Sequence, residues 1–126
     1  HIQYNHLPVI KGMPLQLGQV FQNLISNSLK FTHPLRQPLI KIDTTPTILD
    51  NEPVHVITYQ DNGIGFKPEQ APKIFDVFFR LHSKDEYEGT GVGLAIVKKI
   101  IDQHGGSITA EGKVNEGARF TIVLPR

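Results

Sequence analysis

Three glycines stand at every second position, Gly89, Gly91 and Gly93, and lead into an apolar run within YEGTGVGLAI at 87–96. The backbone N–H groups at the start of a helix have no partners inside the helix, and the helix dipole makes that end electropositive. Glycines there let the backbone approach an anion closely, so phosphate is the natural ligand. A P-loop pattern is absent, and the segment does not follow a strand as a dinucleotide-binding motif should. A flexible hinge is the alternative interpretation of this segment taken alone.

A second group of polar residues lies in NLISNSLK at 23–30. The spacing of Asn23, Asn27 and Lys30 places them on one stripe of a helix, beside its apolar stripe. Amide oxygens can complete a Mg²⁺ shell that water and phosphate otherwise fill, and the lysine can neutralise phosphate charge. Polar residues that merely flank a core face give the same pattern.

The segment QDNGIGF at 60–66 could recognise a flat ring. Asp61 ends a run of β-branched and aromatic residues, where its carboxylate can accept a hydrogen bond from an amino group. Gly63 and Gly65 would let the ring lie against the backbone. A carboxylate that faces an exocyclic amine distinguishes adenine from guanine. Asn62 and Gly63 are equally suited to a hairpin turn, which is the competing hypothesis.

The aromatic segment KIFDVFFR at 73–80 is mainly core in character. Phe75, Phe78 and Phe79 are the residues expected to be buried. Arg80 beside them is different, because a guanidinium can hold a terminal phosphate in a forked geometry.

Periodicity indicates the elements that must position these residues. Apolar residues recur at helical spacing in two segments, and alternation typical of strands occurs in others. Pro34 ends the first helix, and two glycines follow the second as a C-cap. The strands are sequentially paired and the helices can cover one side, which indicates an α+β two-layer sandwich. The predicted elements are helices at 15–31 and 94–104, short helices within 70–80, and strands at 7–11, 39–45, 54–61, 107–112 and 118–125. A polar connection bounded by prolines is expected between the strands at 39–45 and 54–61.

Composition narrows the class of protein. The 126 residues are enough for one domain with a core, and 13 basic against 12 acidic residues leave a net charge of +1. That balance gives no sign of a nucleic-acid or membrane surface. There is no cysteine, which fits the reducing cytoplasm, and the six histidines lack metal-ligand spacing. No apolar run is long enough to cross a bilayer. The start without methionine suggests a fragment of a longer protein.

In order and spacing, these motifs closely resemble the ATP-binding domain of sensor histidine kinases, in the superfamily that includes gyrase, heat-shock chaperones and mismatch-repair ATPases. The resemblance covers roughly residues 7–125, and the segment RLHSKDEYEGTGVGLAI at 80–96 is especially similar to phytochrome-like and related PAS-linked sensors. The segments that carry it are NLISNSLKF at 23–31, DNGIGF at 61–66, IFDVFFR at 74–80, GTGVGLAIVKKIIDQHGG at 89–106 and GARFTIVLP at 117–125.

The resemblance implies a fold and a set of roles. The fold is the GHKL (Bergerat) two-layer α/β sandwich, a mixed, mostly antiparallel sheet covered by helices on one face, over residues 1–126. Asn27 and Asn23 would hold Mg²⁺ on ATP, Lys30 and Arg80 would act on the phosphates, and Asp61 would bind the adenine amino group. Residues 82–92 would form a lid over ATP. The residues implied in ATP binding are Asn23, Asn27, Lys30, Asp61, Gly63, Gly65, Phe66, Phe79, Arg80, Gly89, Thr90, Gly91, Val92, Gly93, Leu94 and Ala118.

The implied activity is a protein-histidine kinase of a cytoplasmic two-component system. The acceptor histidine would lie on a dimerisation and phosphotransfer domain outside this chain, so the isolated chain, a monomer from a homodimeric parent, should turn over almost nothing. A response regulator would be the partner downstream, with no nucleic acid and no direct membrane contact.

Two departures from the family pattern bear on this hypothesis. Ala118 follows Gly117 where a threonine is frequent, which should cost little affinity. Asn23 stands where gyrase-, chaperone- and mismatch-repair-type members carry a glutamate that activates water. Without that base the site suits holding ATP for another acceptor. The alternatives are a degenerate or regulatory nucleotide-binding module without kinase activity, and an anti-sigma-type serine kinase.

Overall fold

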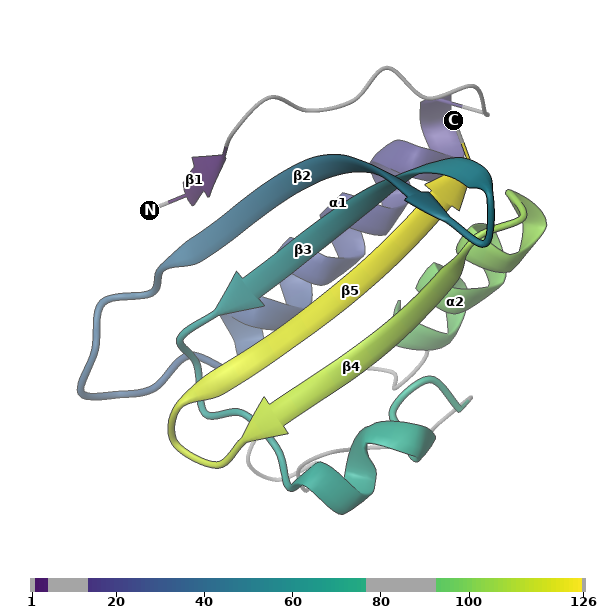
Figure 1. Cartoon of the computed structure of the whole chain (residues 1–126). Coiled ribbons are helices and arrows are strands. Elements are labelled where there is room, and N and C mark those ends of the chain that lie inside the picture. Colours follow the sequence, from purple (N-terminus) through teal and green to yellow (C-terminus); the bar gives the residue numbers. More distant parts are fainter. Residues whose placement is uncertain (1, 5–13, 77–92, 126) are drawn as a thin grey trace.

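A five-stranded sheet forms the centre of the computed structural model, which describes residues 2–4, 14–76 and 93–125 (Figure 1). Its strand order is β1-β2-β3-β5-β4, with β1 parallel to β2 and the other neighbours antiparallel. The strands are β1 (Ile2–Tyr4), β2 (Ile40–Leu49), β3 (Glu52–Asp61), β4 (Ser107–Lys113) and β5 (Gly117–Pro125), and the helices are α1 (Pro14–Lys30), the 3₁₀ helix η1 (Pro68–Lys73) and α2 (Gly93–Gln103).

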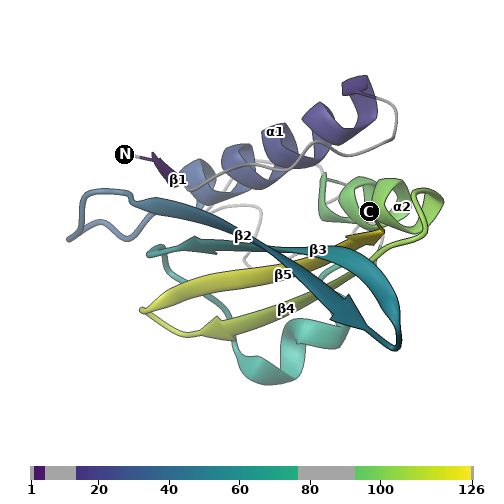
Figure 2. The same cartoon turned by 45° about the horizontal axis from the view of Figure 1, so that its top comes forward.

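The molecule has two layers, the sheet and a layer of helices. In the second layer, α1 and α2 lie side by side on one face of the sheet (Figures 1 and 2). Their apolar stripes meet the inward side chains of β3 and β5, and the core residues Leu24, Val97, Ile57 and Ile122 are all almost fully buried. η1 lies beside β4 at the edge of the sheet. The α+β two-layer sandwich with a mixed, mostly antiparallel sheet is therefore confirmed.

The two long helices follow the predicted periodicity closely. Leu94, Val97, Ile100 and Ile101 are buried along one face of α2, as helical spacing requires. The chain leaves α2 through Gly105 at φ +73°, a left-handed conformation that glycine adopts without strain. This confirms the predicted C-cap, and it turns the chain directly into β4.

The connection between β2 and β3 differs from the prediction. A loop bounded by prolines was expected, but both strands continue through Pro46 and Pro53 to a two-residue turn. Asp50 and Asn51 form that turn with φ of 50° and 64°, the geometry of a tight hairpin. Pro46 is tolerated because it lies beyond the residues of β2 that pair with β1, so no hydrogen bond of the described β1–β2 ladder is lost.

The ends of the described segments also refine the predictions. The strand expected at 7–11 lies outside the described residues, and the first strand that the structure shows is Ile2–Tyr4. Of the short helices expected at 70–80, η1 is present, and residues 77–80 lie outside the description. Phe75 is half-buried and its ring meets Phe120 edge-on at 6.2 Å, as its expected core role requires.

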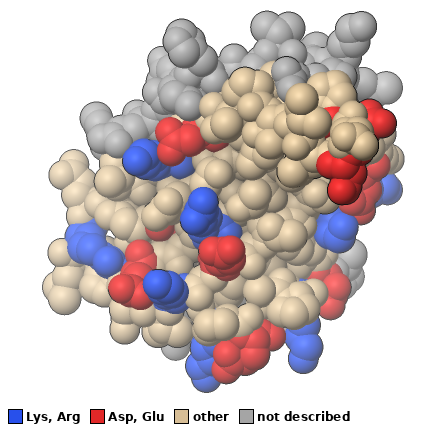
Figure 3. Space-filling model, viewed as in Figure 1, with Lys and Arg blue, Asp and Glu red and all other residues tan. Residues whose placement is uncertain are grey.

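The face of the sheet turned away from α1 and α2 is polar. Lys41, Gln60, Arg119 and Glu111 form one row across β2, β3, β5 and β4. Figure 3 shows basic and acidic side chains interspersed over this face, with no field of one sign. Among the described residues, no helix combines the length and the apolar character needed to cross a membrane.

Candidate functional site

Asp61 is the best-supported candidate residue, because its carboxylate is held by backbone groups of two separate segments. The N–H of Gly63 donates to Oδ1 at 3.0 Å, and the N–H of Ala118 donates to the same oxygen at 3.2 Å. Asp61 is the last residue of β3 and pairs with Ala118 of β5, which explains how both segments reach it. The carboxylate is thereby fixed at the helix-facing side of the sheet.

The second oxygen of Asp61 is held from α1. The hydroxyl of Ser28 donates to Oδ2 of Asp61 at 2.7 Å, and Ser28 Oγ also lies 2.8 Å from the hydroxyl of Tyr59. Tyr59 has no exposed surface, and Ser28 is buried as well. Burial raises the pKa of Tyr59 well above its ordinary value, the Ser28 hydrogen bond opposes this, and the charge of Asp61 adds to it. The phenol therefore stays protonated at every physiological pH.

A small cavity of about 10 Å³ lies beside Asp61, between α1 and the sheet. Asn27, Gly65 and Phe66 line it together with Asp61. This volume holds about one water molecule, so a larger ligand would have to extend beyond the part that these residues enclose. The other lining residues are Phe31, Ala118 and Phe120.

The glycines beside Asp61 are required by close backbone approaches. A Cβ atom on Gly63 would lie 2.4 Å from the carbonyl oxygen of Phe31, and one on Gly65 would lie 2.1 Å from that of Lys113. Gly65 also has φ +67°. These two glycines are thus placed beside the carboxylate by packing of the backbone itself, and the contact with a flat ring that the sequence predicted for this segment stays a prediction.

The polar stripe of α1 lies along the same side of the sheet. Asn27 lines the cavity beside Asp61, and Asn23, one turn earlier, donates from Nδ2 to the carbonyl of Gly93 at 3.5 Å. Lys30 is exposed in the last turn of the helix. Leu94, next to Gly93, is a buried core residue. The structure thus brings Asn27 to Asp61 and Asn23 to the first residue of α2.

The hairpin alternative for Asn62 and Gly63 is wrong, because residues 62–67 connect β3 to η1, and β3 pairs with β2 and β5. Asn62 holds the loop before β2: it accepts from the N–H of Leu39 at 2.8 Å and donates to the carbonyl of Gln37 at 3.0 Å. Its side chain therefore makes the two bonds that order this loop beside the site.

Several predicted site residues lie outside the described residues, and their roles stay predictions. They are Phe79, Arg80, Gly89, Thr90, Gly91 and Val92. Within the described residues, no three His, Asp or Glu side chains gather in a way that could hold a metal ion. A cation at this site would therefore depend on other oxygens, and the amides of Asn27 and Asn23 are of the right chemical kind.

Ser28 and Tyr59 are the site residues that the sequence alone did not single out. Ser28 interrupts the apolar face of α1 with a hydroxyl, and Tyr59 precedes Asp61 by two residues, on the same face of β3. A polar residue inside an apolar stripe, together with a phenol on the Asp61 face, is the signal that could have indicated the pair.

Comparisons with known proteins show the family to which the chain is similar. The family described as histidine kinase-, DNA gyrase B-, and HSP90-like ATPase matches residues 12–126. Phytochrome-like protein Cph1 of Synechocystis sp. is 44% identical over 124 residues, which are 98% of this chain and 16% of that protein. The chain therefore spans about a sixth of the length of this relative.

Solved structures give the same result. The catalytic domain of histidine kinase ThkA superposes with a TM-score of 0.75 at 28% identity, covering 98% of this chain and 77% of that one. Full-length ShkA in complex with AMPPNP superposes with a TM-score of 0.76 at 26% identity, covering 98% of this chain and 25% of that one. These matches confirm the resemblance that the five sequence segments carry.

Proposed function

The chain belongs to the family of histidine kinase-, DNA gyrase B- and HSP90-like ATPases, and we propose that it is the ATP-binding catalytic domain of a sensor histidine kinase. In this proposal it binds ATP with Mg²⁺ and donates the γ-phosphoryl group to a histidine on a dimerisation and phosphotransfer domain. The relatives whose names describe sensors and phytochromes support the assignment to this branch of the family.

The arrangement around Asp61 is the observation that carries the proposal. Its carboxylate accepts from Gly63 and Ala118 on one oxygen and from Ser28 on the other. A carboxylate offers about four acceptor sites, so about one remains. That site suits an amino group, such as the one on adenine, and repels a carbonyl oxygen such as that of guanine. This remaining acceptor site supports the proposal that the chain binds adenine.

The phosphate end of the site is assigned to α1 and the residues that precede α2. Asn27 and Asn23 would hold Mg²⁺ through their amide oxygens, and the ion, when bound, would neutralise charge on the phosphates. The Nδ2 of Asn23 is engaged with Gly93, which leaves its oxygen for a ligand. Lys30, Arg80 and the backbone of Gly89, Gly91 and Gly93 would bind phosphate oxygens directly.

The absence of a base at position 23 favours phosphoryl transfer to another acceptor over hydrolysis of ATP. An asparagine amide cannot accept a proton from water at neutral pH, so this position cannot activate a hydrolytic nucleophile. Phosphoryl transfer depends mainly on positioning and charge neutralisation, and in this proposal Mg²⁺, Lys30, Arg80 and the lid amides would supply both. ATP held in this way is available to an acceptor from another domain, here proposed as histidine.

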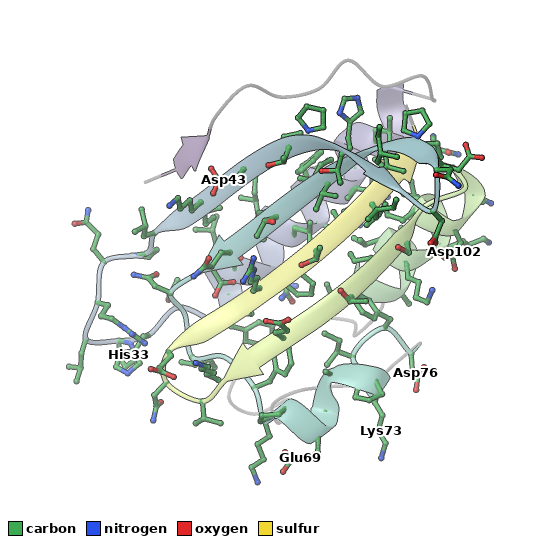
Figure 4. The ribbon with its side chains drawn as sticks, viewed as in Figure 1. His33, Asp43, Glu69, Lys73, Asp76 and Asp102 are labelled. Carbon is green, nitrogen blue, oxygen red and sulfur yellow. The ribbon has the colours of Figure 1, made fainter. Side chains whose placement is uncertain are left out.

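Calorimetric titration with a non-hydrolysable ATP analogue and Mg²⁺ tests the binding step. Asp61→Asn should weaken binding at least about tenfold, since hydrogen bonds to a charged group contribute about 1.5–3 kcal/mol. Asp43→Asn is the matched control, because Asp43 lies on β2 among the side chains of the polar sheet face (Figure 4). Equal binding of ATP and GTP analogues, or equal effects of the two variants, would contradict the adenine assignment.

Phosphotransfer needs a separate experiment. The chain is incubated with γ-labelled ATP and a separately produced dimerisation and phosphotransfer domain, and acid-labile phosphohistidine is measured. Label on the histidine supports the proposed kinase activity. ATP binding without any transfer would favour the regulatory nucleotide-binding module instead.

A further inference from the structure

We infer that Tyr59, acting through Ser28, is a positioning residue that sets the base specificity of Asp61. The inference rests on the proposed function, since it concerns the base that Asp61 recognises. It adds a buried residue of β3 to the site. It arises from a hydrogen-bond chain of three side chains, Tyr59, Ser28 and Asp61, which crosses from the sheet to α1 and back.

The order of protons along this chain is fixed by chemistry. A carboxylate has no proton to give, so the single hydroxyl proton of Ser28 points to Oδ2 of Asp61, 2.7 Å away. Ser28 Oγ can then only accept from Tyr59, whose hydroxyl lies at 2.8 Å. Tyr59 therefore donates to Ser28, and Ser28 donates to Asp61. Hydrogen bonds in such a chain polarise and strengthen one another in a buried environment.

This hydrogen-bond chain determines which ligand group Asp61 can bind. Ser28 occupies one acceptor site of Oδ2, and the two backbone N–H groups occupy Oδ1. The remaining acceptor site of the carboxylate can bond only to a ligand group that donates a hydrogen. The bond from Tyr59 polarises the Ser28 hydroxyl and so strengthens the bond that this hydroxyl donates to Oδ2 of Asp61.

Loss of the Tyr59 hydroxyl would weaken this chain of hydrogen bonds. Ser28 Oγ would keep an unfilled acceptor in a buried position, and its bond to Oδ2 of Asp61 would lose the polarisation that Tyr59 supplies. The carboxylate would then be held less firmly for an adenine amino group, whereas guanine, whose carbonyl oxygen it repels, would lose little. The expected result is weaker binding of adenine and a smaller preference over guanine, with the fold preserved.

Packing of the Tyr59 ring is separable from its hydroxyl. The ring lies 6.2 Å from that of Phe120 at an interplanar angle of 59°, within the core. Tyr59→Phe keeps this contact and removes only the oxygen. Thr44→Val is the control for losing a buried hydroxyl, because Thr44 is buried on β2 and pairs with Ile57, outside the Asp61 row.

The test is a double-mutant cycle with Tyr59→Phe, Ser28→Ala and their combination, titrated with ATP and GTP analogues. Tyr59→Phe should weaken ATP binding about fivefold, as expected for one neutral hydrogen bond, and GTP binding less or not at all. In the Ser28→Ala background Tyr59→Phe should have no further effect on either nucleotide. Equal weakening for both nucleotides, or the same effect in both backgrounds, would overturn the inference and leave Tyr59 a packing residue.

A ligand-free measurement separates this inference from the proposed function. The N–H groups of Gly63 and Ala118 both donate to Asp61, so hydrogen exchange at these two amides reports how firmly the carboxylate is held. Tyr59→Phe and Ser28→Ala should both accelerate it, and Thr44→Val should not. If wild type binds no nucleotide, the proposed function fails, and unchanged exchange at these amides would then overturn the positioning role as well.

Discussion

The guanidinium of Arg36 donates to the carbonyl oxygen of Gly63 at 3.2 Å. The same Nη2 atom also donates to the carbonyl oxygen of Asn115, in the turn between β4 and β5. Asn115 in turn donates from its N–H to Ile64, so three separate segments are joined at one point beside Asp61. A single side chain from the loop before β2 thus holds the glycine segment against the β4–β5 turn.

Arg36→Ala should lower the free energy of unfolding by about 1–3 kcal/mol, because two carbonyl groups lose a charged donor. Urea unfolding measures this loss. Arg119→Ala is the control: Arg119 is exposed on the polar sheet face, and its removal should change stability by less than about 0.5 kcal/mol. Equal losses for the two variants would show that the Arg36 contacts contribute nothing specific.

Periodicity predicted much of the fold for a clear physical reason. Helices that cover a sheet must bury one stripe, so the spacing around Leu24 in α1 and Val97 in α2 is imposed by the core itself. The β2–β3 turn was not predicted, because Pro46 and Pro53 usually end strands. Their tolerance depends on where the sheet edge lies, and a single sequence does not show that.

The site was predictable where one short segment carries it. Asp61, Gly63 and Gly65 lie within five residues, so their types and spacing were informative. Ser28 and Tyr59 are 31 residues apart, and each alone resembles an ordinary core position. Their meeting at Asp61 depends on how α1 packs across β3, which is a property of the folded chain.

Substitutions at two glycines should have opposite effects. Gly65→Ala should cost at least about 3 kcal/mol, or prevent folding, since φ is +67° and the new Cβ would lie 2.1 Å from the carbonyl oxygen of Lys113. Gly18→Ala should stabilise by about 0.5–1 kcal/mol, because Gly18 lies within α1 with nothing within 4 Å of a new Cβ. Thermal unfolding compares both with wild type, and a stable Gly65→Ala variant would contradict the geometry.

The alanine at position 118 should cost little affinity for ATP. Asp61 already accepts three hydrogen bonds, one of them from the N–H of Ala118 itself. Ala118→Ser adds a hydroxyl beside a carboxylate that has about one acceptor site left, so the ATP dissociation constant should change by less than about threefold. Calorimetry on the variant and on wild type measures this. A tenfold gain would contradict the expectation that a hydroxyl at position 118 adds little to ATP binding.

Tyr59 should make the fold sensitive to alkaline pH. Burial raises the pKa of Tyr59 in the folded chain, whereas the unfolded chain ionises near its ordinary value of about 10. The neutral phenol is therefore favoured by folding, and its contribution is complete below about pH 10 and is lost as the pH rises further. Above that pH the free energy of unfolding should fall by up to about 1.4 kcal/mol per pH unit from this group alone. Denaturant unfolding at a series of pH values measures the slope, and Tyr59→Phe should remove this part of it. The same alkaline slope in Tyr59→Phe and wild type would show that the phenol ionises as readily in the folded chain as in the unfolded one.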